Sequence, residues 1–140
     1  MKKFKFGANS NRVLATVKTE LSDVARRALD YGVMDVSAIQ GIRGKSEQDK
    51  CFSLGKSKVK WPNSKHNVVP PEMLADAIDI VPYIKGRLSW DKNHCLVWAG
   101  LMLAAASELD VRIRWGGNWD MDGEPVTDQH FQDLVHFELV

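Results

Sequence analysis

Three side chains of the metal-binding type stand out in the sequence, two histidines and one aspartate. His66, Asp79 and His136 can supply the three His, Asp or Glu ligands of a zinc hydrolase, which leaves one coordination position open. No HExxH motif is present, and spacing alone leaves each histidine open as a surface or hydrogen-bonded imidazole. Asp79 lies in the apolar stretch 76–81, where an acid is costly unless it is paired or bound to a metal.

Two further charged residues could take part in hydrolysis. Asp133 precedes His136 by three positions, and a carboxylate beside a metal site could act as general base. Residues three apart point to opposite sides of a regular strand, so Asp133 is expected on the turn before the last strand, where it could instead cap that turn. Arg43 ends an expected strand, where it could clamp a substrate carboxylate, stabilise an oxyanion or simply be solvated.

The loop that begins at Trp115 combines aromatic residues with glycine. The stretch 115–119 could form the floor of a groove for a sugar or a peptide, and a buried tryptophan at the base of a loop is the alternative. His130 lies near Asp133 and could support it or be exposed. His94 lies near the start of an expected helix, and we interpret it as a structural or surface residue.

Hydrophobic periodicity predicts two long helices and several short strands. Apolar residues at steps of three and four mark helices over 14–29 and 92–109, and a second helix start at Thr19 would divide the first. Alternation and turn residues predict strands over 34–43, 76–81, 111–115 and 135–139, and a short helix over 46–54. We therefore expect one α+β domain, residues 1–140, with a small, mainly antiparallel sheet packed against two long helices.

Composition and charge exclude several other classes of protein. The chain has 19 Lys and Arg against 18 Asp and Glu, a formal charge of +1, which argues against nucleic acid or an anionic membrane as partner. Cys51 and Cys95 form no disulfide framework, and the N-terminus lacks the apolar core of a secretion signal. The apolar run 95–106 is shorter than the roughly 20 residues that span a bilayer. We expect synthesis in the cytoplasm and no membrane insertion.

Four motifs occur in the order that is typical of one peptidase family. They are Gln-Gly-Ile-Arg at 40–43, Ser-Lys-His at 64–66, Ala-Ile-Asp at 77–79 and Asp-Leu-Val-His at 133–136. The chain resembles the small zinc peptidases related to D-alanyl-D-alanine carboxypeptidases. Within them it is most similar to bacteriophage endolysins of the L-alanyl-D-glutamate peptidase type, and the resemblance covers nearly the whole chain.

This resemblance implies roles for the residues at the motif positions. It implies that His66, Asp79 and His136 bind Zn²⁺ and that Asp133 is the catalytic acid and base. It also implies that Arg43 contacts the substrate or stabilises the transition state.

The resemblance further implies supporting polar residues at Ser64 and Gln48, and a substrate groove near Trp115. The segment 67–75 departs from the family pattern, because it is long and contains two prolines but no glycine. We interpret it as an inserted loop. It makes Asp76 a rival ligand, but the Ala-x-Asp pattern favours Asp79.

The function implied is a zinc-dependent endopeptidase that cleaves the L-alanyl-D-glutamate bond of the peptidoglycan stem peptide and lyses the bacterial host. The alternatives are a D-alanyl-D-alanine carboxypeptidase and a wall-binding module that has lost activity. The resemblance also implies release from the host cytoplasm through a membrane-permeabilising, holin-type protein. We expect the enzyme to be a monomer.

Overall fold

Four helices and five strands occur in residues 3–140, the part of the chain that the computed structural model describes. The helices are α1 (Ala8–Leu14), α2 (Thr19–Asp30), α3 (Lys45–Ser53) and α4 (Lys92–Glu108). The strands are β1 (Val36–Gln40), β2 (Ala77–Ile84), β3 (Arg87–Leu88), β4 (Ile113–Gly116) and β5 (Asp133–Leu139). None of the helices within residues 3–140 is long and apolar enough to cross a bilayer.

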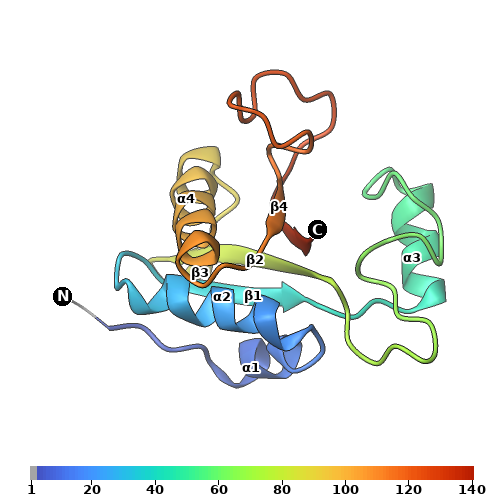
Figure 1. The fold of residues 1–140 in the computed structure, drawn as a ribbon, viewed down its shortest axis with the longest axis horizontal. Helices are drawn as coiled ribbons and strands as arrows, with labels where there is room; N and C mark the ends of the chain where they lie inside the picture. The colour runs from blue at the N-terminus through green and yellow to red at the C-terminus, as the bar shows by residue number, and fades with distance from the viewer. Residues whose placement is uncertain (1–2) are drawn as a thin grey trace.

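The strands form one mainly antiparallel sheet in the order β1-β2-β5-β4, and β3 forms a hairpin with β2. Helix α4 packs on β2, β4 and β5, α2 packs on α4, and α1 packs on β1. Figure 1 shows α3 apart from the other helices, at the far end of the sheet. The structure therefore confirms the α+β class and the mainly antiparallel sheet.

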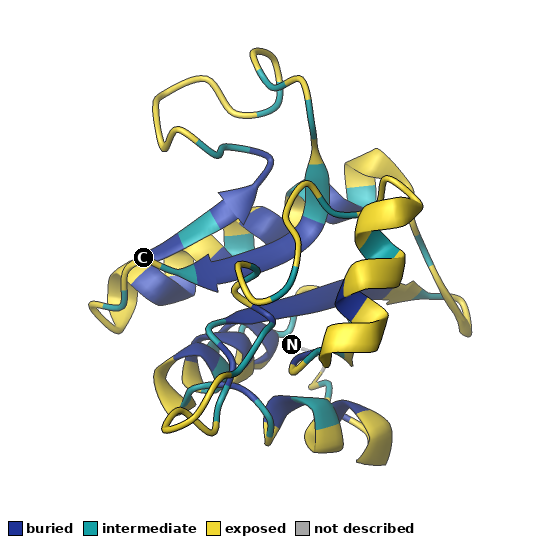
Figure 2. Ribbon diagram, turned by 90° about the vertical axis from the view of Figure 1, so that its right-hand side faces the viewer, coloured by how far each residue is buried: buried dark blue, intermediate teal, exposed yellow. Residues whose placement is uncertain are grey.

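The apolar periodicity of the two long helices produces the core. The buried residues of α2 recur at steps of three and four: Leu21, Val24, Ala25, Ala28 and Leu29. Helix α4 contributes Trp98 and Met102, which are fully buried against the sheet. In Figure 2 the central strands are dark blue, whereas α3 and the loop between β4 and β5 are mostly yellow. The buried part of the fold is thus the sheet and the helices packed on it, whereas α3 and the loop between β4 and β5 are exposed.

The first predicted helix is divided into α1 and α2, at the alternative start that Thr19 indicates. Val17 forms an isolated parallel bridge with Ala75, and the Lys18 amide donates to the Ala75 carbonyl at 2.9 Å. Because these bonds hold the backbone extended, the helix cannot continue through residue 18. Gly32 follows α2 with φ of 73°, a conformation that suits a helix end.

Strand β2 continues past Pro82, where the sequence predicts its end. The Tyr83 amide donates to Asp35 at 2.9 Å, and the Pro82 carbonyl accepts from Ser89 at 2.8 Å. The backbone nitrogen and carbonyl of Pro82 therefore point away from β1, toward the side of β5. The pairing of β2 with β5 ends at Asp79, before Pro82 is reached. The missing N–H of proline costs no ladder bond there, so the strand extends to Ile84.

Candidate metal centre and active site

The side chains of His66, Asp79 and His136 converge, although they lie far apart in the sequence. Asp79 is on β2 and is directly opposite His136 on β5, while His66 comes from the loop that precedes β2. Nε2 of His66, Nδ1 of His136 and Oδ1 of Asp79 are each 3.2 Å from the other two. All three residues are buried. The sequence-based grouping of these residues is therefore reproduced in space.

The outer nitrogens of both imidazoles already have acceptors. Nδ1 of His66 lies 2.7 Å from the Gly41 carbonyl, and Nε2 of His136 lies 2.8 Å from Oε1 of Glu138. Each ring therefore carries a hydrogen on its outer nitrogen, and a neutral ring directs a lone pair at the shared centre. Three acceptors that meet without a donor require a positive charge between them.

The dimensions of this triangle suit a metal ion. Ligand atoms about 2.0–2.1 Å from a tetrahedral zinc ion are separated by about 3.3 Å, close to the 3.2 Å found here. Two imidazole nitrogens and one carboxylate oxygen are also the donor types of catalytic zinc sites. The buried group His66–Asp79–His136 can therefore bind a metal ion.

Electrostatics within the cluster favour positive charge. Although burial favours the neutral acid, the imidazoles of His66 and His136 hold the pKa of Asp79 well below its ordinary value. Burial lowers the pKa of His136, but its hydrogen bonds to Asp79 and Glu138 outweigh burial and raise that pKa to about 9. Both shifts have one cause, namely that the negative carboxylate of Asp79 and a positively charged imidazole stabilise each other.

Asp133 reaches the same site because the pairing of β4 with β5 is irregular. Trp115 is opposite Phe137, but the next residue of β4, Gly116, is opposite Asp133. The expectation of a turn at Asp133 is therefore wrong, since Asp133 begins β5. The irregularity breaks the strict alternation of the strand, which lets Asp133 and His136 line the same cavity. Burial and the negative charge of Asp79 raise the pKa of Asp133.

Arg43 lies beside the cluster and is held by Gln48. Nη2 of Arg43 is 3.7 Å from Oδ2 of Asp79, and Nη1 donates to Oε1 of Gln48 at 3.1 Å. Gln48 is fully buried on α3, where its amide donates to the Ser57 hydroxyl and the Val59 carbonyl. The structure thus places Gln48 behind Arg43, as a residue that orients the guanidinium.

A cavity of about 610 Å³ opens above these residues. One wall is formed by the segment that follows α3, and the other by the loop between β4 and β5. Figure 1 shows the orange-red loop rising above the sheet and the green segment beside α3, to the right of that loop. Arg43, His66, Asp133 and His136 all line this cavity, so a bound peptide would meet the metal-binding group and both charged residues together.

Comparisons with known proteins agree with this geometry. The family model of phage L-alanyl-D-glutamate peptidases matches residues 2–140. This chain belongs to that family. It is 40% identical to the L-alanyl-D-glutamate peptidase of Escherichia phage T5 over 124 residues, which cover 86% of this chain and 85% of that protein.

A solved structure supports the same assignment. The L-Ala D-Glu endopeptidase ChiX of Serratia marcescens matches with a TM-score of 0.78 and 27% identity, over 99% of this chain and 91% of that one. The protein is thus an L-alanyl-D-glutamate peptidase of the phage endolysin type. The carboxypeptidase and the inactive wall-binding module are accordingly disfavoured.

Of the two other predicted site residues of this peptidase, one lies at the cavity and the other in the core. Ser64 lines the cavity, and its hydroxyl accepts a hydrogen bond from the His66 amide at 3.2 Å. Trp115 is buried in the core, and its indole donates to the Leu134 carbonyl. Trp119 and Phe131 of the loop between β4 and β5 do line the cavity, and the ring centroid of Trp119 is 5.4 Å from that of His136.

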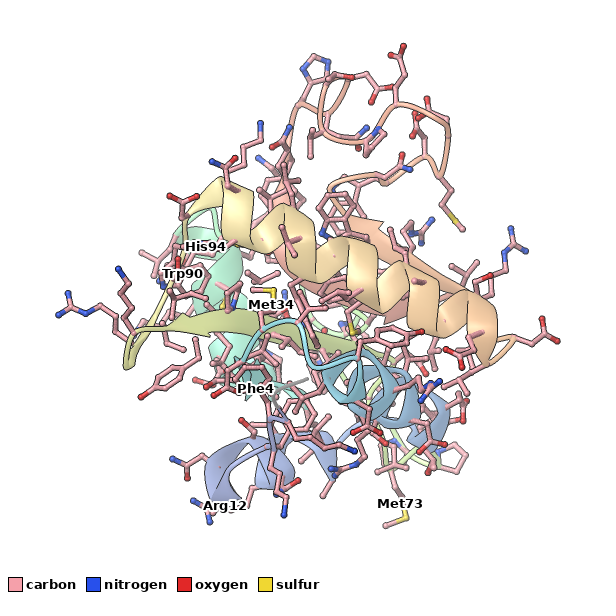
Figure 3. All side chains as sticks on the ribbon, turned by 90° about the vertical axis from the view of Figure 1, so that its left-hand side faces the viewer. Phe4, Arg12, Met34, Met73, Trp90 and His94 are labelled. Carbon is pink, nitrogen blue, oxygen red and sulfur yellow. The ribbon has the colours of Figure 1, made fainter. Side chains whose placement is uncertain are left out.

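The rival ligand Asp76 and the other two histidines do not belong to the metal-binding group. Asp76 faces Lys18, with 3.8 Å between its Oδ1 and the ammonium, so it is not part of the metal-binding group. His130 is exposed at the cavity wall. His94 is near the start of α4, where Figure 3 shows it beside Trp90, and it forms a 2.6 Å hydrogen bond with Ser89.

Glu138 is a buried residue beside the metal-binding group that the sequence did not single out. It is buried, it accepts from His136, and it pairs with Arg114 at 2.8 Å. Although burial opposes ionisation, these two partners hold the pKa of Glu138 below its ordinary value. The available signal was the strand periodicity, because residues 136 and 138 share one face of a strand.

Proposed function

We propose that the peptidase is a zinc enzyme, with His66, Asp79 and His136 as its three protein ligands. The observation that supports this most directly is the triangle of three acceptor atoms, each 3.2 Å from the others. The outer hydrogen bonds to Gly41 and Glu138 fix the orientation of both rings, as is usual around metal-binding histidines.

Zinc, when bound, supplies a Lewis acid that polarises the scissile carbonyl and lowers the pKa of water. Asp133 takes the proton of the attacking water as general base and then donates it to the departing amine of the D-glutamyl residue. Burial and the negative charge of Asp79 raise the pKa of Asp133, which favours acceptance of a proton from water.

Arg43 provides positive charge for the oxyanion that forms at the scissile carbonyl. Its guanidinium is nearly buried beside Asp79 and is fixed by Gln48, so little reorganisation is needed during the reaction. Ser64 supports the loop that carries His66, and Trp115 supports β5 from the core. We assign these two residues a role in shaping the substrate site.

The proposed setting is host lysis at the end of the phage cycle. A single catalytic domain, acting as a monomer, cleaves the stem peptide of peptidoglycan after synthesis in the host cytoplasm. Release to the wall depends on a holin-type protein that permeabilises the membrane.

The decisive experiment combines metal analysis with identification of the product. The purified enzyme should contain about one zinc per chain, lose activity with a chelator and regain it with zinc. Mass spectrometry of digested peptidoglycan should show a new N-terminal D-glutamyl residue. Asp133→Asn should retain zinc and lose about 10²- to 10⁴-fold in kcat. Full activity in protein without metal would refute the zinc assignment.

A further inference from the structure

One wall of the catalytic cavity carries three lysines without an acidic partner. Lys56, Lys58 and Lys65 line the cavity and are exposed. Within residues 3–140, none of them lies within 4 Å of a carboxylate oxygen. The lysine and arginine residues that do form such pairs are Lys18, Arg27, Arg43, Lys45 and Arg114. The lysine wall is therefore a local excess of positive charge in a nearly neutral protein.

An aromatic row connects this wall to the metal-binding group. The ammonium of Lys58 lies 5.2 Å from the centroid of the Phe131 ring, and Phe131 stacks on Trp119 with an interplanar angle of 13°. Trp119 in turn contacts His136. A substrate that reaches the metal-binding group through this cavity thus passes along the aromatic row and beside the lysines.

The opposite wall has the opposite charge. Asp120 and Asp128 line the cavity from the loop between β4 and β5. The cavity therefore presents positive charge on one side and negative charge on the other, and it can orient a substrate that carries charges of its own. The lysine wall attracts the free carboxylates of the substrate, whereas Arg43 and Arg114, which also line the cavity, already lie within 4 Å of Asp79 and Glu138.

The L-alanyl-D-glutamate bond that this family cleaves places one carboxyl group of the substrate next to the scissile bond. A D-glutamyl residue has two carboxyl groups, and only one can continue the peptide chain. The other remains next to the scissile bond, either as a free carboxylate or as a carboxamide. Lysine is a compact charge on a flexible four-carbon stem, so an exposed lysine can move to meet such a carboxylate.

We propose that the wall formed by Lys56, Lys58 and Lys65 recognises the free carboxylate of the D-glutamyl residue, and so makes the enzyme selective against amidated stem peptides. The proposal rests on the L-alanyl-D-glutamate peptidase activity and adds a specificity to it. Exposed charge pairs are individually weak, so the three lysines together produce a preference of about tenfold in kcat/KM.

The test uses two soluble stem peptides that differ only in this group, carboxylate or carboxamide. Wild-type enzyme loaded with zinc should cleave the carboxylate peptide with about tenfold higher kcat/KM. The variant K56Q/K58Q/K65Q should lose this preference, with kcat/KM for the carboxamide peptide changed less than twofold. The charge-conserving variant K56R/K58R/K65R should keep the preference.

A matched control removes the same charge elsewhere. Lys5, Lys85 and Lys92 are exposed and do not line the cavity, so K5Q/K85Q/K92Q should behave as wild type. Raising the salt from about 50 to 500 mM should weaken the wild-type preference several-fold, because screening becomes stronger.

Two results would overturn the proposal while leaving the peptidase assignment intact: equal cleavage of both peptides by wild-type enzyme, or an unchanged preference in K56Q/K58Q/K65Q. Failure of zinc-loaded wild-type enzyme to cleave either peptide would instead remove the activity on which the proposal rests.

Discussion

The guanidinium of Arg43 donates from Nη1 to the side-chain oxygen of Gln48, 3.1 Å away, and Gln48 itself is fully buried. The amide nitrogen of Gln48 is used as well, because it donates to Ser57 and to the Val59 carbonyl. The direction of the Arg43 side chain is therefore set by α3 and the segment that follows it, although Arg43 acts beside β2.

We expect Gln48→Ala to lower kcat by about ten- to a hundredfold, since small displacements of a positioned group have effects of this size. Zinc content should not change, because Gln48 contacts none of the three ligands. Asp49→Asn, on the same helix but exposed, is the control and should have wild-type kcat. If Gln48 acts through Arg43, the losses in Gln48→Ala and Arg43→Ala will not add in the double variant.

The raised pKa of Asp133 predicts the pH dependence of the reaction. A general base must be ionised, so activity falls as the pH is lowered through its pKa. Because burial and Asp79 raise that pKa, the acid limb of kcat/KM should lie above the value of about 3.9 for a free aspartate. Metal content is measured at each pH, and the residual activity of Asp133→Asn should lack this limb. A limb that persists in the variant would contradict the assignment.

We expect Glu138 to strengthen metal binding. Because it accepts from His136 and thereby orients the ring, Glu138→Gln should weaken zinc affinity by about 10- to 100-fold. Chelator competition measures this effect. Glu108→Gln is the matched control, since Glu108 is an exposed acid paired with Arg27, and it should bind zinc as wild type does. Unchanged affinity in Glu138→Gln would show that His136 needs no such support.

At Gly41, we expect that one added methyl group destabilises the fold. A Cβ there would collide with Oγ1 of Thr16 and lie 2.9 Å from the Val13 carbonyl. Gly41→Ala should therefore lower the free energy of unfolding by about 1–3 kcal/mol and weaken zinc binding, since the Gly41 carbonyl holds His66.

Gly100→Ala provides the comparison for Gly41→Ala. A Cβ at Gly100 meets nothing within 4 Å, and the residue lies inside α4, so the variant should be stabilised by about 0.5–1 kcal/mol. Urea denaturation measures both variants. Equal stability of the two would mean that the backbone adjusts at Gly41.

Much of the fold could be predicted from local pattern. The steps of three and four in α2 and α4, and the alternation in β1, β2 and β5, report which side of each element is buried. Asp79 was conspicuous for the same reason, as an acid inside an apolar strand. The boundaries were less predictable, because Pro82 and residues 15–18 depend on neighbours that are distant in sequence.

For the site, the sequence indicated which residues to consider, whereas their placement depended on the tertiary structure. Family resemblance was enough to select His66, Asp79, His136 and Asp133, but it did not show how Asp133 reaches them. An irregular step between Trp115 and Gly116 decides that, and it belongs to the pairing of two strands.

By itself, then, the sequence indicated the main elements, the faces they bury and the three residues that converge in the metal-binding group. The tertiary structure alone decided which tryptophan faces the cavity, which carbonyl and carboxylate hold the two imidazoles, and what Gln48 orients. The physical reason is that periodicity along a chain encodes burial, which is a local property. Contacts between residues that are distant in sequence, such as 41 and 66 or 79 and 136, depend on how the chain folds back in three dimensions.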